Sequence, residues 1–155
     1  MEAKSTDRKT MQLTENEQVL ATLIYENSFM FKAKITIVNS DSYEVKQVGF
    51  WGTSIIVTKD DIEIASLKMN WSSQIIFTYR DGQEYILKTK GTFNSIYILE
   101  NNEQEKLIQL HPKFSWSKFD YSYEIFYDKK SKDLLLIMLG IYAANYSIAT
   151  MSGAM

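Results

Sequence analysis

The sequence predicts a mainly β fold, a closed or nearly closed antiparallel β-barrel of about 10–12 strands around one C-terminal hydrophobic α-helix. Three observations support this prediction. Short runs alternate apolar and polar residues, turn-forming residues separate these runs, and no charged residue occurs from Leu134 to Met155. A barrel that encloses a helix needs more than eight strands, because the side chains of an eight-stranded barrel fill its own interior.

The alternating runs have the period of two residues that is typical of strands with one buried face. Ala33, Ile35 and Ile37 alternate with lysine and threonine, and a second run alternates Ile75, Phe77 and Tyr79 with other residues. A late run places four apolar or aromatic side chains on one face: Tyr121, Tyr123, Ile125 and Tyr127. We expect about ten such strands between residues 18 and 127.

Turn-forming residues separate the runs roughly every 8–12 residues, as in sandwiches and barrels. Asp81-Gly82 joins two of them and predicts a hairpin with a two-residue type I′ turn, which needs positive φ at both positions. Other turn signals are Asn39-Ser40-Asp41, Lys59-Asp60-Asp61, Gly91 and Asn101-Asn102.

The chain of 155 residues is long enough for one domain with its own core. Residues 1–17 are polar, and we expect a flexible lead-in there. Residues 18–155 are predicted to form a single domain whose core helix covers about residues 132–151. Ser131 or Asp133 is the expected N-cap of that helix.

The last helix is apolar on nearly every side, so it must be buried on all sides or lie in a membrane. Residues 134–150 nearly reach the length of a membrane span. In that alternative the chain is a tail-anchored membrane protein, and the lysines just before the helix hold the β domain on the cytoplasmic side. These lysines are Lys129, Lys130 and Lys132.

The other alternative places the helix inside the barrel, and the polar residues of the helix favour it. Asn145 is in the middle of the helix, where a lipid-facing amide would be costly and would need a partner. Gly140, Ala144 and Ser147 would form a stripe of small residues where strands press close.

The composition excludes several function classes. A net charge of −2 argues against a broad surface for nucleic acid, and the absence of cysteine excludes disulfides and thiolate ligands. We expect no cofactor and no metal, because no nucleotide-binding or calcium-binding loop motif occurs. The first residues contain no apolar segment typical of a secretory signal, so we expect a cytoplasmic location, with membrane association as an open alternative.

No catalytic residues stand out. His111, the only histidine, precedes Pro112 and is interpreted as an ordinary loop residue. A small hydrolase that uses two strand carboxylates is the weakest alternative. The carboxylates considered for it are Glu26, Glu44, Glu63, Glu84 and Glu124.

A basic and aromatic set of residues is the candidate ligand site. Arg80, Lys88 and Lys90 lie on either side of the Asp81-Gly82 turn, and Trp71 precedes them. Lys88 and Lys90 are two residues apart and share a face. Cationic side chains of this kind favour anions such as phosphate.

Four stretches resemble members of the tubby C-terminal-like superfamily, with the LURP-one-related and phospholipid-scramblase-like branches as the nearest match. These stretches are residues 55–69, 75–91, 95–110 and 118–144. The resemblance implies a roughly twelve-stranded barrel around a central hydrophobic helix, and roles in membrane-lipid binding, tethering or regulation. The phosphoinositide-binding basic motif of the tubby proteins is not found in this sequence, nor is the proline-rich, cysteine-containing lead-in of the scramblases.

Together, these observations predict a non-catalytic binding or scaffold domain. Its expected partner is a membrane lipid headgroup or a protein, and nucleic acid is not expected.

Overall fold

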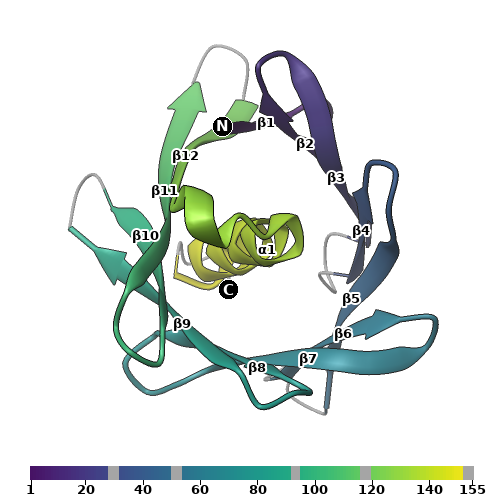
Figure 1. Cartoon of the computed structure of the whole chain (residues 1–155). Helices are drawn as coiled ribbons and strands as arrows, with labels where there is room; N and C mark the ends of the chain where they lie inside the picture. Colours follow the sequence, from purple (N-terminus) through teal and green to yellow (C-terminus); the bar gives the residue numbers. More distant parts are fainter. Residues whose placement is uncertain (28–31, 50–53, 92–94, 116–119, 152–155) are drawn as a thin grey trace.

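A computed structural model describes residues 1–27, 32–49, 54–91, 95–115 and 120–151. In these residues, twelve antiparallel strands form one closed barrel, and a single α-helix runs through the middle of the ring (Figure 1). The predicted fold class is therefore confirmed. Each strand pairs with the next one in the sequence, and β1 pairs with β12 to close the barrel.

The strands are short and follow one another as an up-and-down meander. Their bounds are β1 Glu2–Ser5, β2 Thr10–Glu15, β3 Gln18–Asn27, β4 Lys32–Ile37, β5 Ser42–Val48, β6 Ser54–Lys59, β7 Ile62–Met69, β8 Ile75–Tyr79, β9 Glu84–Lys90, β10 Ile96–Asn101, β11 Lys106–Ser115 and β12 Asp120–Tyr127. A 3-10 helix, η1 (Lys129–Ser131), and α1 (Leu134–Met151) follow.

The period-two pattern produces the barrel interior, because alternate side chains of a strand point to opposite faces. In β4, Ala33, Ile35 and Ile37 are buried, as predicted. Ile75 and Phe77 of β8 are buried in the same way. The inward-facing side chains of all twelve strands meet α1 in one continuous core.

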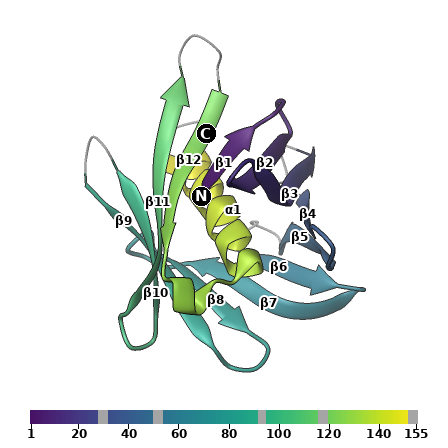
Figure 2. The same cartoon turned by 45° about the horizontal axis from the view of Figure 1, so that its top comes forward.

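The helix α1 begins directly after Asp133, whose Oδ1 accepts a hydrogen bond from the backbone N–H of Leu136 at 3.1 Å. Asp133 is therefore the N-cap, whereas Ser131 belongs to η1. Residues 136–144 are all buried, so the uniform apolar character of the helix matches an environment of strands on every side. Figure 2 shows the same helix inclined inside the ring.

The tail-anchor alternative requires a lipid-exposed helix. In the structure, the central residues of α1 are enclosed by strands. No helix within the described ranges has both the length and the apolar character needed to cross a membrane.

The predicted flexible lead-in over residues 1–17 is wrong. These residues form β1 and β2, in which Ala3, Met11 and Leu13 are buried. The strand β1 contains one buried hydrophobic side chain in four residues, so its sequence shows no clear period. Its pairing with β2 and β12 is what keeps it ordered in the barrel, and that pairing is a long-range property.

The Asp81-Gly82 hairpin is confirmed, but its turn type is not the predicted one. Only Gly82 of the pair has a positive φ, at 91°, and its N–H donates to the carbonyl of Tyr79. This is the longer hairpin loop in which a glycine in the left-handed region follows a type I turn. Positive φ at both positions occurs instead at Asn16-Glu17 and Asp60-Asp61.

One smaller expectation also differs from the structure. His111 and Pro112 lie inside β11, opposite Glu124 and Tyr123 of β12, and not in a loop. The strand count agrees with the prediction: ten strands, β3 to β12, lie between residues 18 and 127, and β1 and β2 bring the total in the described residues to twelve.

Candidate functional site at the two ends of the barrel

The antiparallel meander gives the barrel two ends with different chemistry. We call the end where α1 begins the N-cap end, and the end where α1 finishes the distal end. The N-cap end carries the connections at residues 16–17, 38–41, 60–61, 80–83 and 102–105, and Figure 2 shows two of them beside the start of α1. The distal end carries the turns at residues 6–9 and 70–74.

The N-cap end is acidic. Its five connections contain the carboxylates Glu17, Asp41, Asp60, Asp61, Asp81, Glu103 and Glu105. Arg80 is the one basic side chain in these five connections, and the β12–α1 segment at the same end adds Lys129, Lys130 and Lys132 together with Asp128 and Asp133. A polar pocket of about 580 Å³ opens here between the β8–β9 and β10–β11 connections and the start of α1, and Glu84, Asp133 and Lys132 are among the residues that line it.

A cluster of three residues ties the start of α1 to β2. The Tyr127 hydroxyl donates to Glu15 Oε2 at 2.7 Å, and Lys132 Nζ donates to Glu15 Oε1 at 2.9 Å. These two bonds, the tyrosine first, lower the pKa of Glu15. The same carboxylate raises the pKa of Tyr127 and of Lys132. Both oxygens of the Glu15 carboxylate therefore accept hydrogen bonds within the protein. We assign this cluster a structural role.

The distal end is basic. Exposed cations lie on its turns and in the halves of the strands nearest to it. Six of them form no ion pair with another residue in the described part of the chain: Arg8, Lys9, Lys34, Lys46, Lys68 and Lys90. The acidic residues at this end, in the described part of the chain, are Asp7, Glu26 and Asp120, and Glu26 pairs with Lys32 at 3.3 Å.

The turn between β7 and β8 presents Trp71 to solvent at the distal end, with a fully exposed side chain (relative exposure 104%). Asn70 holds this turn in shape. Its Oδ1 accepts from the backbone N–H groups of Ser72 and Gln74 at 2.9 and 3.0 Å. The apolar surface of this indole is not buried against any described residue. Tryptophan is enriched at protein and membrane interfaces, so Trp71 is a candidate contact residue.

The structure brings together three of the four predicted ligand residues. Trp71, Lys88 and Lys90 lie toward the distal end, on β9 and on the turn that precedes β8. Arg80 follows β8, so it lies at the N-cap end, and the length of the five-residue strand β8, about 17 Å, separates it from the turn that carries Trp71. The hairpin separates them because its two strands run in opposite directions, which places Lys90 far from the turn.

Lys88 already has a partner. Its Nζ lies 2.9 Å from Glu100 Oε2 on the adjacent strand β10, and the Glu100 side chain is only 12% exposed. Lys90, two residues further along β9, is exposed and shares the outer face with Lys88, as predicted. Lys90 is therefore the freer cation of the two for an external anion.

A pocket of about 300 Å³ opens at the distal end, beside the last turns of α1. We call it the Asn145 pocket. The described residues that line it are Ser5, Asp7, Arg8, Lys9, Thr10, Met11, Tyr25, Tyr121, Asn145, Ile148 and Ala149. Its volume lies at the lower limit of small-molecule sites.

A hydrogen-bonded network forms the inner wall of the Asn145 pocket. The Tyr123 hydroxyl donates to Asn145 Oδ1 at 2.6 Å, and Asn145 Nδ2 donates to the Tyr25 hydroxyl at 3.0 Å. Asn145 Nδ2 also lies 3.4 Å from Met11 Sδ. An asparagine in the middle of the helix was predicted to need a hydrogen-bond partner. Tyr25 of β3 and Tyr123 of β12 are these partners.

The tyrosines around this wall are neutral at physiological pH. Burial raises the pKa of Tyr25 and of Tyr123. Tyr25 also stacks on Tyr142 of α1, with ring centroids 6.0 Å apart. The wall therefore offers apolar surface and neutral dipoles, and a formal charge of a ligand would be desolvated against it at high cost.

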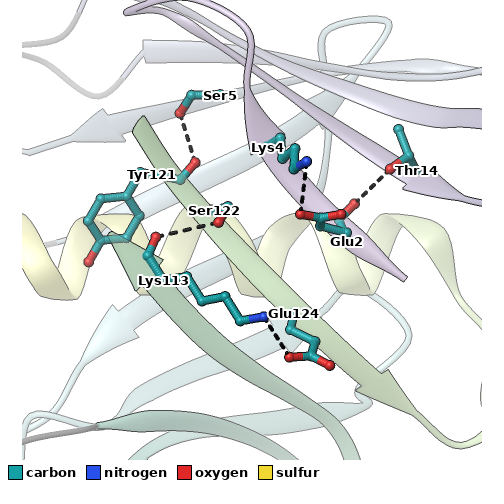
Figure 3. A network of polar contacts seen from close by, with 8 residues as sticks. All are labelled: Glu2, Lys4, Ser5, Thr14, Lys113, Tyr121, Ser122 and Glu124. Atoms are coloured by element: carbon teal, nitrogen blue, oxygen red, sulfur yellow. Dashed lines mark hydrogen bonds and ion pairs between the residues drawn. The ribbon is translucent and has the colours of Figure 1, made fainter. Parts of the chain in front are cut away.

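The outer face beside the barrel closure carries a further polar network, formed by residues of β1, β2, β11 and β12 (Figure 3). Ser5 Oγ donates to the Tyr121 carbonyl at 3.1 Å, and Lys113 Nζ lies 3.0 Å from Glu124. Lys113 lowers the pKa of Glu124. Both contacts join neighbouring strands and assist closure; the Ser5–Tyr121 bond is partly buried, whereas the Lys113–Glu124 pair is exposed and contributes little to stability.

Two of the carboxylates considered for a hydrolase, Glu26 and Glu124, do not show the environment that catalysis needs. A general acid has a raised pKa, whereas the pKa of Glu124 is lowered and Glu26 is ion-paired on the surface. Across the described ranges, no group of three or more histidine, cysteine or carboxylate side chains could hold a metal ion.

Comparisons of the chain with protein-family models, with curated proteins and with solved structures returned no match. The site must therefore be argued from its own geometry.

Arg8, Lys9 and Met11 were not among the predicted site residues, because residues 1–17 were expected to form a flexible lead-in. The alternation of Met11 and Leu13 with polar residues was a signal that could have revealed this strand.

Proposed function

We propose that this chain is a non-catalytic binding domain that docks its distal end onto an anionic lipid surface. The observation that carries the proposal is the group of exposed, unpaired cations at the end of the barrel that also displays Trp71. The opposite end has an excess of carboxylates, so the net charge of −2 conceals a strong asymmetry along the barrel axis. Such an asymmetry orients a protein toward an anionic surface.

The magnitudes favour this kind of partner. A lysine or arginine near an anionic bilayer contributes about 1 kcal/mol of attraction. Several such side chains, together with one interfacial tryptophan, are enough for reversible binding at physiological salt. The resemblance to the tubby C-terminal-like superfamily, which implies lipid binding, points in the same direction. A cytoplasmic location at the membrane surface stays a prediction, and so does a protein partner.

The test is co-sedimentation of the full chain with phosphatidylcholine vesicles that contain either no phosphatidylserine or about a third of it. We expect binding to the anionic vesicles only, and we expect added salt to weaken it. Replacing both lysines in Lys68→Gln/Lys90→Gln removes about 2 kcal/mol, so affinity should fall about thirtyfold. Arg80→Gln, a basic residue at the N-cap end, is the matched control and should bind like the parent.

Equal binding to neutral and anionic vesicles would overturn the proposal, as would a double lysine variant that binds like the parent. Binding to a DNA oligonucleotide but not to anionic vesicles would also overturn it, since the partner would then be a nucleic acid. Trp71→Ala provides a second readout. It should weaken vesicle binding without changing the thermal unfolding temperature, because Trp71 makes no buried contact.

A further inference from the structure

The Asn145 pocket lies at the distal end but is distinct from the outer cations Lys68 and Lys90, so what it accepts is a separate question. Besides Asn145, the helix residues that line it are Ile148 and Ala149, and Met11 of β2 lines it as well. These side chains give the pocket an aliphatic surface.

The polar groups in the inner wall are already engaged. Asn145 uses Oδ1 for Tyr123 and Nδ2 for Tyr25, so its amide bonds within the protein. A polar ligand group at the inner wall could bond the Asn145 amide only if the amide lost its bonds to Tyr123 and Tyr25. Such an exchange gives no net gain in hydrogen bonding. The wall therefore suits an apolar group, because burial of methylene groups needs no polar partner.

The mouth of the pocket has the opposite character. Arg8 and Lys9 lie on the exposed turn between β1 and β2, and neither forms an ion pair within the described part of the chain. The nearby Asp7 carboxylate accepts a hydrogen bond from the backbone N–H of Lys9 at 2.7 Å, and this bond lowers its pKa. Two cations and one carboxylate leave an excess of one positive charge.

The carboxyl end of α1 acts against an anion here, since the last turn of the helix contains no basic residue. The partial charge at that end of a helix is about −0.5 of an elementary charge. The excess full positive charge on the turn is larger, so the mouth remains attractive to an anion.

We infer that the Asn145 pocket binds a single aliphatic chain that carries an anionic headgroup, with the chain against Met11, Ile148 and Ala149 and the headgroup beside Arg8 and Lys9. This inference goes beyond the docking function and does not depend on it. The ligand class is defined by the two halves of the site, because the interior excludes charge and the mouth attracts an anion.

The experiment is isothermal titration of the full chain with three amphiphiles of equal chain length, all below their micelle-forming concentrations. The probes are decanoate, decan-1-ol and decyltrimethylammonium. We expect decanoate to bind most tightly and the cationic amphiphile most weakly. Within a series of shorter carboxylates, each buried methylene should raise the affinity about fourfold until the chain no longer fits.

Two variants separate the parts of the site. Ala149→Phe fills the pocket and should abolish decanoate binding, whereas Val19→Phe adds the same ring on the outer face of β3 and should not. Arg8→Glu/Lys9→Glu changes only exposed side chains, so it tests the mouth even if Ala149→Phe fails to fold. This double reversal should lower the decanoate affinity at least tenfold and raise that of the cationic amphiphile, and Arg80→Glu is its control.

Decanoate binding no tighter than that of decyltrimethylammonium would overturn the inference. Unchanged decanoate binding by a folded Ala149→Phe protein would also overturn it. The two proposals fail separately because Lys68→Gln/Lys90→Gln and Trp71→Ala test vesicle binding at residues that do not line the pocket, whereas Ala149→Phe fills the pocket and leaves every cation in place.

Discussion

The substitution Asn145→Leu tests whether the hydrogen-bonded amide inside the barrel stabilises the fold. Leucine has a similar volume, but it removes the acceptor for the Tyr123 hydroxyl and the donor to the Tyr25 hydroxyl. Two lost hydrogen bonds cost about 1 kcal/mol each, and a buried hydroxyl left without its partner adds about 1–3 kcal/mol. Tyr123 is fully buried, so water does not replace the lost acceptor.

We therefore expect the free energy of unfolding to fall by about 3 kcal/mol in Asn145→Leu. For a chain of this size, that corresponds to about 6–12 °C in thermal unfolding temperature. The assay is urea unfolding followed by circular dichroism for the parent, Asn145→Leu, Tyr123→Phe and the double variant. The double variant should lose less than the sum of the two single losses, because either change alone breaks the same bond.

A coupling energy of zero in this cycle would refute the reasoning, since it would mean that the 2.6 Å contact between Tyr123 and Asn145 does not contribute to stability. An Asn145→Leu protein as stable as the parent would lead to the same conclusion. The three tryptophans remain unchanged in all four proteins, so fluorescence gives an independent measurement of the same transitions.

Two further predictions concern the rest of α1 and its anchoring. The pKa of Glu15 is lowered in the folded state, so the stability that it contributes is present above its unfolded pKa near 4.5 and is lost as the pH falls through the folded value. Urea unfolding between pH 3 and pH 7 should therefore show a smaller pH dependence for Glu15→Gln than for the parent; equal slopes would contradict the roles of Tyr127 and Lys132. At Gly140, an added Cβ would meet Leu110 Cδ1 at 3.6 Å, which is an ordinary contact, so Gly140→Ala should be at least as stable as the parent through a helix-propensity gain of about 0.5–1 kcal/mol. Gly140→Leu should lose about 1–3 kcal/mol by overpacking, and a Gly140→Ala protein clearly less stable than the parent would show that this part of the barrel is tighter than its contacts indicate.

Much of the fold could be predicted because burial imposes a local period on the chain. Tyr123 and Ile125 point inward two residues apart, and the pattern of their neighbours is visible without any structure. The absence of charge after Asp133 also predicts that α1 has no solvated face. The strand β1 could not be found in this way, because one buried alanine in four residues is no pattern.

The candidate sites were only partly visible in the sequence. Trp71 and Lys90 were selected for their chemistry, and the structure places both toward one end. Arg80 was grouped with them because it is near in sequence, yet antiparallel pairing puts it at the other end of β8. The Asn145 pocket could not be predicted, since β1, β2, β3 and α1 meet there only when the barrel closes.

The sequence by itself determined the fold class and the position of the core helix along the chain, because both follow from local patterns of residues, and it narrowed the N-cap to Ser131 or Asp133. Tertiary structure decided the register, the closure of β1 on β12 and the separation of acidic and basic ends. The physical reason is that net charge is a sum over the chain, whereas an electrostatic asymmetry depends on which strand ends lie together. In an up-and-down barrel, successive connections alternate between the two ends. Residues on either side of one short strand are therefore close in sequence but lie at opposite ends of the molecule.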